Sequence, residues 1–208
     1  MVQKEPESAR RPRGRPRTFD VELVLDKARA VFWNLGYAAT SLDDLAAATG
    51  LNRPSLYAAF GDKHALYLAA LERSRAEATA ALGAALKTEA PLRQLLGIIF
   101  DRTVDIYRAG AVGQRGCFLI GTAVTQAVDD PAAREMLATF IGQTDALFTA
   151  RFERDAAQLA PGVTPRMAGP MASATFHTLA VRSRTGAGEA ELKAIGAAAV
   201  ALFCGPPR

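Results

Sequence analysis

Apolar side chains recur at alternating three- and four-residue steps along nearly the whole chain, which is the spacing of one face of an α-helix. In residues 21–35 this stripe is bounded by Asp20, which can cap the start of a helix, and by Gly36, which can end it. No stretch alternates apolar and polar residues for long enough to predict a strand. We therefore expect an all-α fold. The predicted helices, about nine in number, cover residues 21–35, 42–49, 53–60, 62–88, 91–109, 117–128, 131–159, 165–184 and 188–203.

The composition is that of a globular chain. It has 208 residues, half of them hydrophobic, which suffices for one or two domains with a buried core. Its longest apolar run, residues 194–205, is shorter than the roughly 18 residues of a membrane-spanning helix. The polar first 17 residues lack the apolar core of a signal peptide, and two cysteines are too few for a disulfide framework or a cysteine zinc site. These features predict a cytoplasmic protein.

The net charge of +4 is concentrated at one end of the chain. Residues 1–18 contain six basic and two acidic residues, whereas basic and acidic residues balance over the rest. We interpret residues 1–17 as a disordered basic arm. Its prolines keep the backbone extended, and its core resembles an AT-hook, so Arg13, Arg15 and Arg17 are predicted to enter a narrow A·T-rich minor groove. The alternative is a solvated tail that aids solubility.

Residues 42–59 have the layout of a helix-turn-helix, with two short helices joined by a turn at Gly50. Ser41 and Asp44 form a capping-box pattern before the first helix, and Asn52 can cap the second. An arginine can hold guanine and an asparagine can hold adenine through paired hydrogen bonds in the major groove. The pattern therefore predicts DNA reading, and the alternative is an ordinary helical hairpin. The residues that the second helix would expose are Asn52, Arg53, Pro54 and Ser55.

A wider set of residues around this segment matches a known pattern. Its members are Phe32, Gly36, Tyr37, Thr40, Ser41, Leu42, Leu45, Ala46, Ala47, Gly50, Leu51, Ser55, Leu56, Tyr57, Phe60, Lys63, Ala65 and Leu66. On these residues, the chain over 15–75 resembles the DNA-binding domain of the TetR/AcrR (tetracycline repressor) family of bacterial regulators. The later residues resemble the family only in the number and length of their helices. Pro54 and Ser55 depart from the residues that many members carry, so no base preference is carried over.

The resemblance implies a three-helix DNA-binding domain over residues 18–62 and a helical ligand-binding and dimerisation domain over residues 63–208. It implies that Thr40 and Ser41 hold a phosphate at a helix N-terminus. The other expected DNA contacts are Asn52, Arg53 and Ser55 at base edges, with Pro54 beside them, and Tyr57 and Lys63 at phosphates. His64, next to Lys63, is expected to be an ordinary surface residue.

A protein that reads DNA in this way binds a two-fold site and is therefore expected to dimerise. The last two predicted helices carry apolar stripes flanked by small residues, which suit an intermolecular four-helix bundle. The alternative is that these stripes pack inward. The candidate interface residues are Met171, Thr175, Leu179, Leu192, Ile195, Ala199 and Leu202.

The middle helices are expected to enclose a pocket for a small, largely apolar effector, with about half of the candidates lining it and the others forming core. The candidates are Phe100, Val104, Tyr107, Cys117, Phe118, Thr122, Gln126, Phe140, Thr144, Phe148, Phe152 and His177. Cys117 has two interpretations. It is either a thiol of lowered pKa that senses oxidants or electrophiles, or a small core residue.

Enzyme motifs are absent from the sequence: there is no nucleophile elbow, phosphate-binding loop, dinucleotide fingerprint or zinc-protease motif. The acidic pairs at 43–44 and 129–130 are interpreted as helix-start charges. We therefore expect a homodimeric repressor, without cofactor or metal, that a ligand releases from a palindromic operator. The alternatives are an activator, a non-specific A·T-preferring architectural DNA binder, and a thiol-based sensor.

Overall fold

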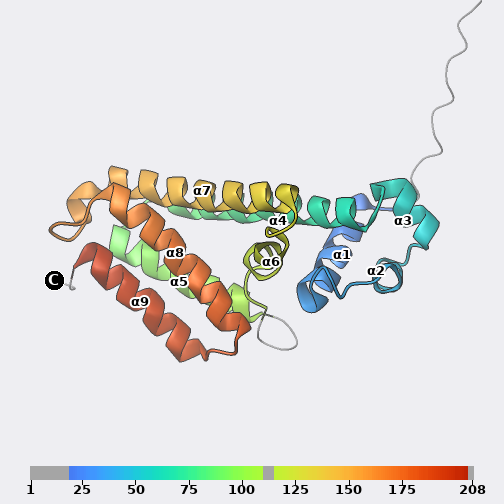
Figure 1. Cartoon of the computed structure of the whole chain (residues 1–208). Helices are drawn as coiled ribbons and strands as arrows, with labels where there is room; N and C mark the ends of the chain where they lie inside the picture. Colours follow the sequence, from blue (N-terminus) through green and yellow to red (C-terminus); the bar gives the residue numbers. More distant parts are fainter. Residues whose placement is uncertain (1–18, 110–114, 206–208) are drawn as a thin grey trace, which may run out of the picture.

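The computed structural model describes residues 19–109 and 115–205, and these ranges contain helices, turns and loops but no strand (Figure 1). The all-α prediction is confirmed. The helices are α1 (Val21–Leu35), α2 (Leu42–Thr49), α3 (Arg53–Phe60), α4 (Lys63–Leu86), α5 (Leu92–Arg108), α6 (Val124–Gln126), α7 (Pro131–Arg154), α8 (Pro165–Arg184) and α9 (Glu189–Cys204). A π-helical turn, η1 (Leu119–Ala123), leads into α6, and a 3-10 turn, η2 (Ala156–Gln158), follows α7. Arg13, Arg15 and Arg17 lie outside the described residues.

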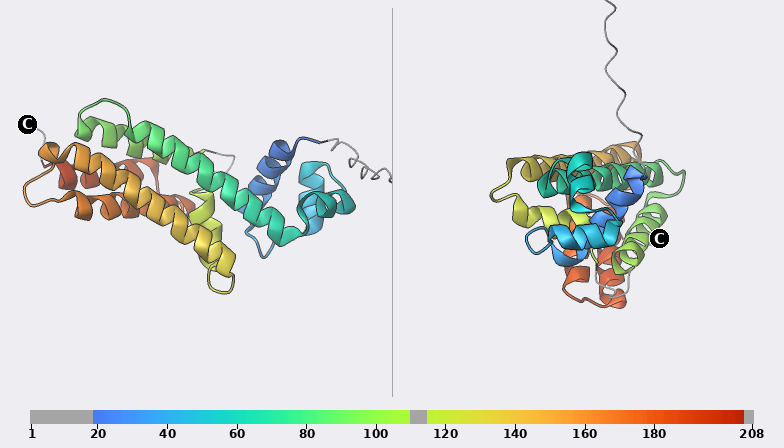
Figure 2. Two further views of the ribbon diagram at one scale, coloured as in Figure 1. Left: turned by 90° about the horizontal axis from the view of Figure 1, so that it is seen from above. Right: turned by 90° about the vertical axis from the view of Figure 1, so that its right-hand side faces the viewer.

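The molecule is elongated, with α1, α2 and α3 gathered at one end and a larger helical body at the other (Figures 1 and 2). The long helix α4 belongs to both parts, because it packs against α1 and, further along, against α7. Within the body, α8 packs on α7, and α5 packs against α8 and α9. The small end is therefore joined to the body by a continuous helix.

The two short helices α2 and α3 begin where the sequence supplies a capping side chain. Ser41 Oγ accepts a hydrogen bond from the Asp44 N–H at 3.1 Å, and the Asp44 carboxylate accepts one from the Ser41 N–H at 2.8 Å. Asn52 Oδ1 accepts from the Ser55 N–H at 2.9 Å. Between the helices, Gly50 has a φ of 76°, a left-handed conformation that costs glycine little. The predicted starts of both helices are thus confirmed.

The core of the small end is built around aromatic residues. Phe32 of α1, Leu45 of α2, Leu56 of α3 and Tyr67 of α4 are all buried in this core. The rings of Phe32 and Tyr67 meet edge to face, with centroids 5.2 Å apart. This packing fixes the position of α3 relative to α4.

Two glycines allow helices of the body to approach closely. A Cβ on Gly169 of α8 would overlap the hydroxyl of Thr149 on α7. A Cβ on Gly196 of α9 would lie 2.9 Å from the Cβ of Phe100 on α5. The body is therefore packed most tightly where α7 meets α8 and where α5 meets α9.

Two predicted helices are shorter in the structure. The segment predicted as a helix over 117–128 contains only η1 and the single turn α6. Helix α7 ends at Arg154, because Asp155 leaves the helical conformation and its carboxylate accepts from Nε of the buried Arg151 at 2.5 Å. The Arg151 guanidinium in turn donates to the carbonyl oxygens of Leu86, Thr88 and Ala90. Arg151 therefore caps the C-terminal end of α4.

Candidate nucleic-acid interface

Helix α3 presents its outer face to solvent at the end of the molecule away from the body (Figure 1). Asn52, Arg53, Pro54 and Tyr57 are exposed, and Ser55 is half-buried. The predicted base-reading residues therefore lie together at the start of one exposed helix.

The Arg53 guanidinium is held by Asp43 of α2. Its Nε donates to Oδ1 at 2.8 Å and its Nη2 donates to Oδ2 at 2.5 Å, which is a parallel two-bond arrangement. These hydrogen bonds lower the pKa of the Asp43 carboxyl and raise the pKa of Arg53. The sequence interpretation had treated Asp43 only as a helix-start charge, and a ten-residue separation across a turn gives no local signal of such a pair.

Two expected phosphate contacts, Thr40 and Lys63, are engaged within the protein. Thr40 is only 2% exposed, and its hydroxyl donates to the Gly36 carbonyl oxygen at 2.6 Å, so the prediction of a phosphate-binding hydroxyl is wrong. Lys63 Nζ donates to the carbonyl oxygens of Tyr37 at 3.0 Å and Thr40 at 2.8 Å. It also lies 4.4 Å from the centroid of the Tyr37 ring. Lys63 therefore ties the α1–α2 turn to the start of α4.

Two other expected phosphate contacts lie at the surface. Tyr57 is 47% exposed on α3. Ser41 is exposed at the N-terminus of α2, but its hydroxyl donates to the Asp44 carboxylate at 2.6 Å. A phosphate at Ser41 would therefore compete with the capping box for that hydroxyl hydrogen.

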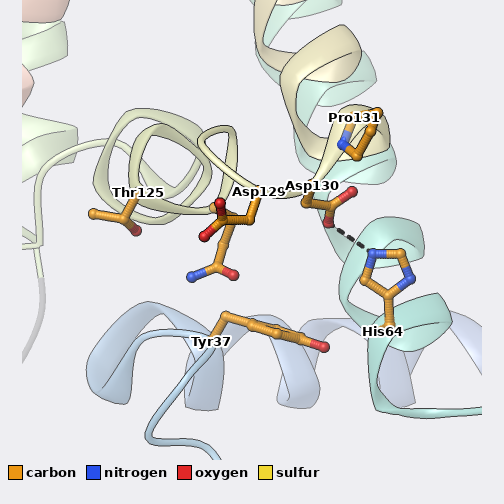
Figure 3. A pocket seen from close by; sticks show the side chains of 7 residues that line it. Tyr37, His64, Thr125, Asp129, Asp130 and Pro131 are labelled. Atoms are coloured by element: carbon orange, nitrogen blue, oxygen red, sulfur yellow. Dashed lines mark hydrogen bonds and ion pairs between the residues drawn. The ribbon is translucent and has the colours of Figure 1, made fainter.

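His64, expected to be an ordinary surface residue, is partly exposed and also joins the small end to the body. Its Nε2 lies 2.7 Å from Asp130 Oδ2 at the start of α7 (Figure 3). Burial opposes ionisation of Asp130, but the hydrogen bond from His64 and those from backbone N–H groups leave its pKa lowered. The pair borders a polar hollow of about 420 Å³ that also contains Tyr37 and Asp129. Gln126, predicted for the effector pocket, lies in this hollow instead.

A second junction is built around Trp33 near the end of α1. The Trp33 indole N–H donates to the Arg115 carbonyl oxygen at 2.8 Å, and Arg184 of α8 donates to the Trp33 carbonyl oxygen at 3.0 Å. Nearby, the Tyr67 hydroxyl donates to Thr122 Oγ1 at 3.0 Å. Helices α1 and α4 are thus bonded to η1 and α8.

An apolar cavity of about 650 Å³ lies in the body, between α4, α5 and the segment that leads into η1. Four of the candidate effector residues line it: Tyr107, Cys117, Phe118 and Phe140. Its α4 wall, with Ala78, Ala81 and Ala85, is absent from the prediction. The signal available in the sequence was the run of small residues at helical spacing on α4.

The other candidates do not line this cavity. The rings of Phe100 and Phe148 are stacked with centroids 6.3 Å apart, and Phe148 stacks in turn on Phe152. Thr144 is hydrogen-bonded to Ser173 at 2.9 Å. The remaining candidates outside the cavity lining are Val104, Thr122 and His177. Val104 is a buried core residue, and Thr122 is a junction residue that accepts from the Tyr67 hydroxyl. His177 packs against the Phe140 ring with centroids 5.8 Å apart, and its buried Nε2 has no hydrogen-bond partner among the described residues.

The environment of Cys117 opposes a reactive thiolate. The side chain is buried, and burial raises the pKa of its thiol despite hydrogen bonds from the N–H groups of Ile120 and Leu119 and from Tyr107. A raised pKa leaves less of the nucleophilic thiolate at neutral pH. Of the two interpretations of Cys117, its burial and raised pKa favour the small core residue.

The predicted dimer stripes are only partly at the surface. Leu179, Leu192 and Ala199 are buried within the chain, so their assignment to an interface is wrong. Ile195 and Thr175 are half-buried, the latter donating to the Met171 carbonyl oxygen at 2.9 Å. The exposed apolar residues of α8 and α9, which we call the α8–α9 patch, are Met167, Met171, Val181 and Leu202.

Within the two described ranges, no helix is long and apolar enough to cross a membrane. The same ranges contain no group of three or more histidine, cysteine, aspartate or glutamate side chains that could hold a metal ion.

Comparison with known proteins bears most strongly on the small end. The sequence model described as "Bacterial regulatory proteins, tetR family" matches residues 24–70. The HTH-type transcriptional repressor ComR of Escherichia coli is 47% identical over 73 residues, which are 35% of each chain. The uncharacterized HTH-type transcriptional regulator YezE of Bacillus subtilis is 34% identical over 118 residues, 57% of this chain and 60% of YezE. The alignments thus span between about a third and three fifths of these relatives.

Solved structures extend the likeness to the body. The TetR-family transcriptional regulator CifR, as a cysteine mutant complexed with 26bp double-strand operator DNA, gives a TM-score of 0.79 at 28% identity, covering 89% of this chain and 98% of CifR. The reduced form of E. coli NemR gives a TM-score of 0.78 at 17% identity, covering 90% of this chain and 98% of NemR, and supports the fold alone. Together with the matched residues 24–70, these likenesses show that the small end is similar to the DNA-binding domain of the TetR family of bacterial regulatory proteins, and that the described chain has the fold of regulators of that family.

Proposed function

We propose that this chain is a homodimeric transcriptional repressor that binds a palindromic DNA operator and is released from it by a small, largely apolar ligand. The observation that carries the proposal is the exposed start of α3, where Asn52 and Arg53 lie side by side on a capped helix of a helix-turn-helix. CifR, which is similar over most of its length, has been solved with operator DNA. In this proposal residues 18–62 read DNA, and residues 63–208 bind the ligand and dimerise.

In the proposed complex, α3 lies in the major groove. Arg53 donates to a guanine and the Asn52 amide contacts an adenine, with Pro54 and Ser55 against the base edges. Tyr57 and the α2 N-terminus at Ser41 would approach phosphates. Lys63 donates to two carbonyl oxygens within the protein, so its remaining ammonium hydrogen would contact a phosphate.

The dimer would form through the α8–α9 patch. Its four exposed apolar side chains lie on neighbouring helices, and such a surface gains free energy when a second copy covers it. A two-fold dimer would present two α3 helices to half-sites about 34 Å apart, one turn of DNA.

Retention of genomic fragments by the purified protein at about 0.15 M salt, followed by sequencing, tests the proposal. We expect enrichment of an inverted repeat near a few promoters. Uniform retention of A·T-rich fragments would contradict it and favour an architectural DNA binder.

A further inference from the structure

The apolar cavity, which we call the groove, follows α4 and α5 and is closed by residues of α1, η1, α7 and α8. On α4 its wall is formed by Ala78, Ala81 and Ala85, whose spacing places three small side chains on one helix face. On α5 the lining runs from Leu95 to Ile106, a length of about 16 Å at 1.5 Å per residue. The small α4 side chains leave the space that the α5 side chains do not fill. The groove therefore suits a long, narrow apolar body.

Three charged residues line this groove: Arg29, Glu77 and Arg102. Two of them neutralise each other, because Arg29 Nη1 donates to Glu77 Oε2 at 2.6 Å. Glu77 also accepts from Arg73 Nε at 2.7 Å. Arg102 differs, since within the described residues its side chain makes no ion pair and no hydrogen bond.

Two neighbours of Arg102 in the lining of the groove are apolar and exposed, whereas the exposed Asp101 and Asp105 of the same helix are not part of the lining. Ile98 and Ile106, one helical turn before and after it, also line the groove, and Ile106 is 62% exposed. A guanidinium between two exposed isoleucines forms a rim that is complementary to an anion attached to an apolar chain. A cationic ligand would meet repulsion there. A ligand with several negative charges would have only Arg102 to pair with in the described lining, and its other charges would be left without a partner.

We propose that the effector is an amphiphile with a single negative charge, whose apolar body lies in the groove and whose carboxylate binds Arg102. The inference rests on the proposed function, since it names the chemical class of the released repressor's ligand. It adds a charge to a ligand that the sequence indicated only as largely apolar. A carboxylate fits the planar guanidinium through two parallel hydrogen bonds, which an alcohol cannot form.

Calorimetric titration of the full chain with dodecanoate and with dodecanol, both below their aggregation concentrations, tests this assignment. We expect dodecanoate to bind, and Arg102→Gln to weaken its binding by about tenfold or more while changing dodecanol binding by less than about twofold. The matched control is Arg166→Gln, which removes an exposed arginine of α8 outside the groove and should change neither. Ala81→Phe, which fills the groove, should weaken both ligands.

Equal weakening of both ligands by Arg102→Gln, or an unchanged affinity for dodecanoate, would overturn the assignment of the headgroup. Failure of dodecanoate, octanoate and naphthalene-2-carboxylate to bind would overturn the ligand class. Operator binding is measured in parallel with and without dodecanoate. Binding at Arg102 without release of DNA would support the assigned ligand class and headgroup contact of the groove, and would contradict the role of that ligand as the effector in the proposed function.

Discussion

At the scale of single residues, the main feature is that the predicted base reader is already engaged. Arg53 forms two hydrogen bonds with Asp43 while both side chains remain exposed. Exposed ion pairs add little to the free energy of unfolding. The main effect of this pair is therefore to orient the Arg53 guanidinium. A guanidinium with a fixed orientation loses less conformational entropy when it contacts a base.

Arg53→Ala is expected to lower operator affinity by about 1–3 kcal/mol and random-duplex affinity by less, because a base contact is lost. The ratio of the two affinities, measured by fluorescence anisotropy at constant salt, checks this. Arg166→Ala is the matched control, since it removes an exposed arginine of α8 far from α3. Equal losses on both duplexes would show that Arg53 contacts phosphates only.

Residue roles were predictable where they depend on neighbours in the sequence. Ser41, Asp44 and Asn52 act as caps, as their spacing indicated. Lys63 and Thr40 were not predictable, because their partners are backbone carbonyl oxygens whose direction is set by the folded α1–α2 turn. Hydrogen bonds to backbone carbonyl oxygens depend on how a turn folds, so the order of residues in the sequence does not predict them.

At the scale of helices, the sequence predicted which helices form and in what order. Where some helices end and which of their residues are buried depended on packing between helices. Helix α7 ends early because Arg151 and Asp155 are drawn into capping α4, a contact between residues far apart in the chain. The periodicity of α8 and α9 located their apolar faces, but it could not say which members face inward. Leu179 and Leu192 meet the protomer's own core, and only Met171 and Leu202 of that stripe are well exposed.

The α7–α8 crossing should be sensitive to a single methyl group. Gly169→Ala is expected to destabilise the protein by about 1–3 kcal/mol, because the new Cβ overlaps Thr149. Gly142→Ala, within α7 and with nothing within 4 Å of the new Cβ, should instead be neutral or stabilise by up to about 1 kcal/mol. Urea denaturation of both variants measures the difference. Equal stability of the two would contradict the close approach of α7 and α8.

At the scale of the whole molecule, the small end and the body are joined by α4 and by contacts on either side of it. One contact is the His64–Asp130 pair, and the other is centred on Trp33. Each involves residues more than 60 positions apart in the sequence, so neither could be predicted from local patterns.

Asp130→Asn is expected to lower stability at pH 7 by about 1 kcal/mol, since asparagine keeps the helix cap but replaces the carboxylate that is hydrogen-bonded to His64 by a neutral amide. The pKa of Asp130 is lowered in the folded state, so its contribution is present above the unfolded pKa and is lost as the pH falls through the folded one. The difference in melting temperature between the variant and the parent protein should become smaller below about pH 4. Asp62→Asn, which changes a capping aspartate bonded to the Ala65 N–H, is the matched control for loss of a cap charge.

The α8–α9 patch is expected to hold the dimer. Met171→Glu with Leu202→Glu should give a monomer in sedimentation at micromolar concentration, because charges would be buried without partners. Val128→Glu changes an equally exposed apolar residue outside the patch and should leave the mass unchanged. A dimer that survives the double substitution would place the interface elsewhere.

Trp33 is the single tryptophan of the chain. Its indole ring borders the apolar groove, lies 5.2 Å from the Arg115 guanidinium and donates to the Arg115 carbonyl oxygen, while its own carbonyl is held by Arg184. Intrinsic indole emission from this protein therefore arises from one place, where groove, α1 and α8 meet. The emission wavelength and intensity of Trp33 in the unlabelled protein would therefore change when a ligand enters the groove or when the small end moves relative to α8. Both events can be followed in one fluorescence spectrum.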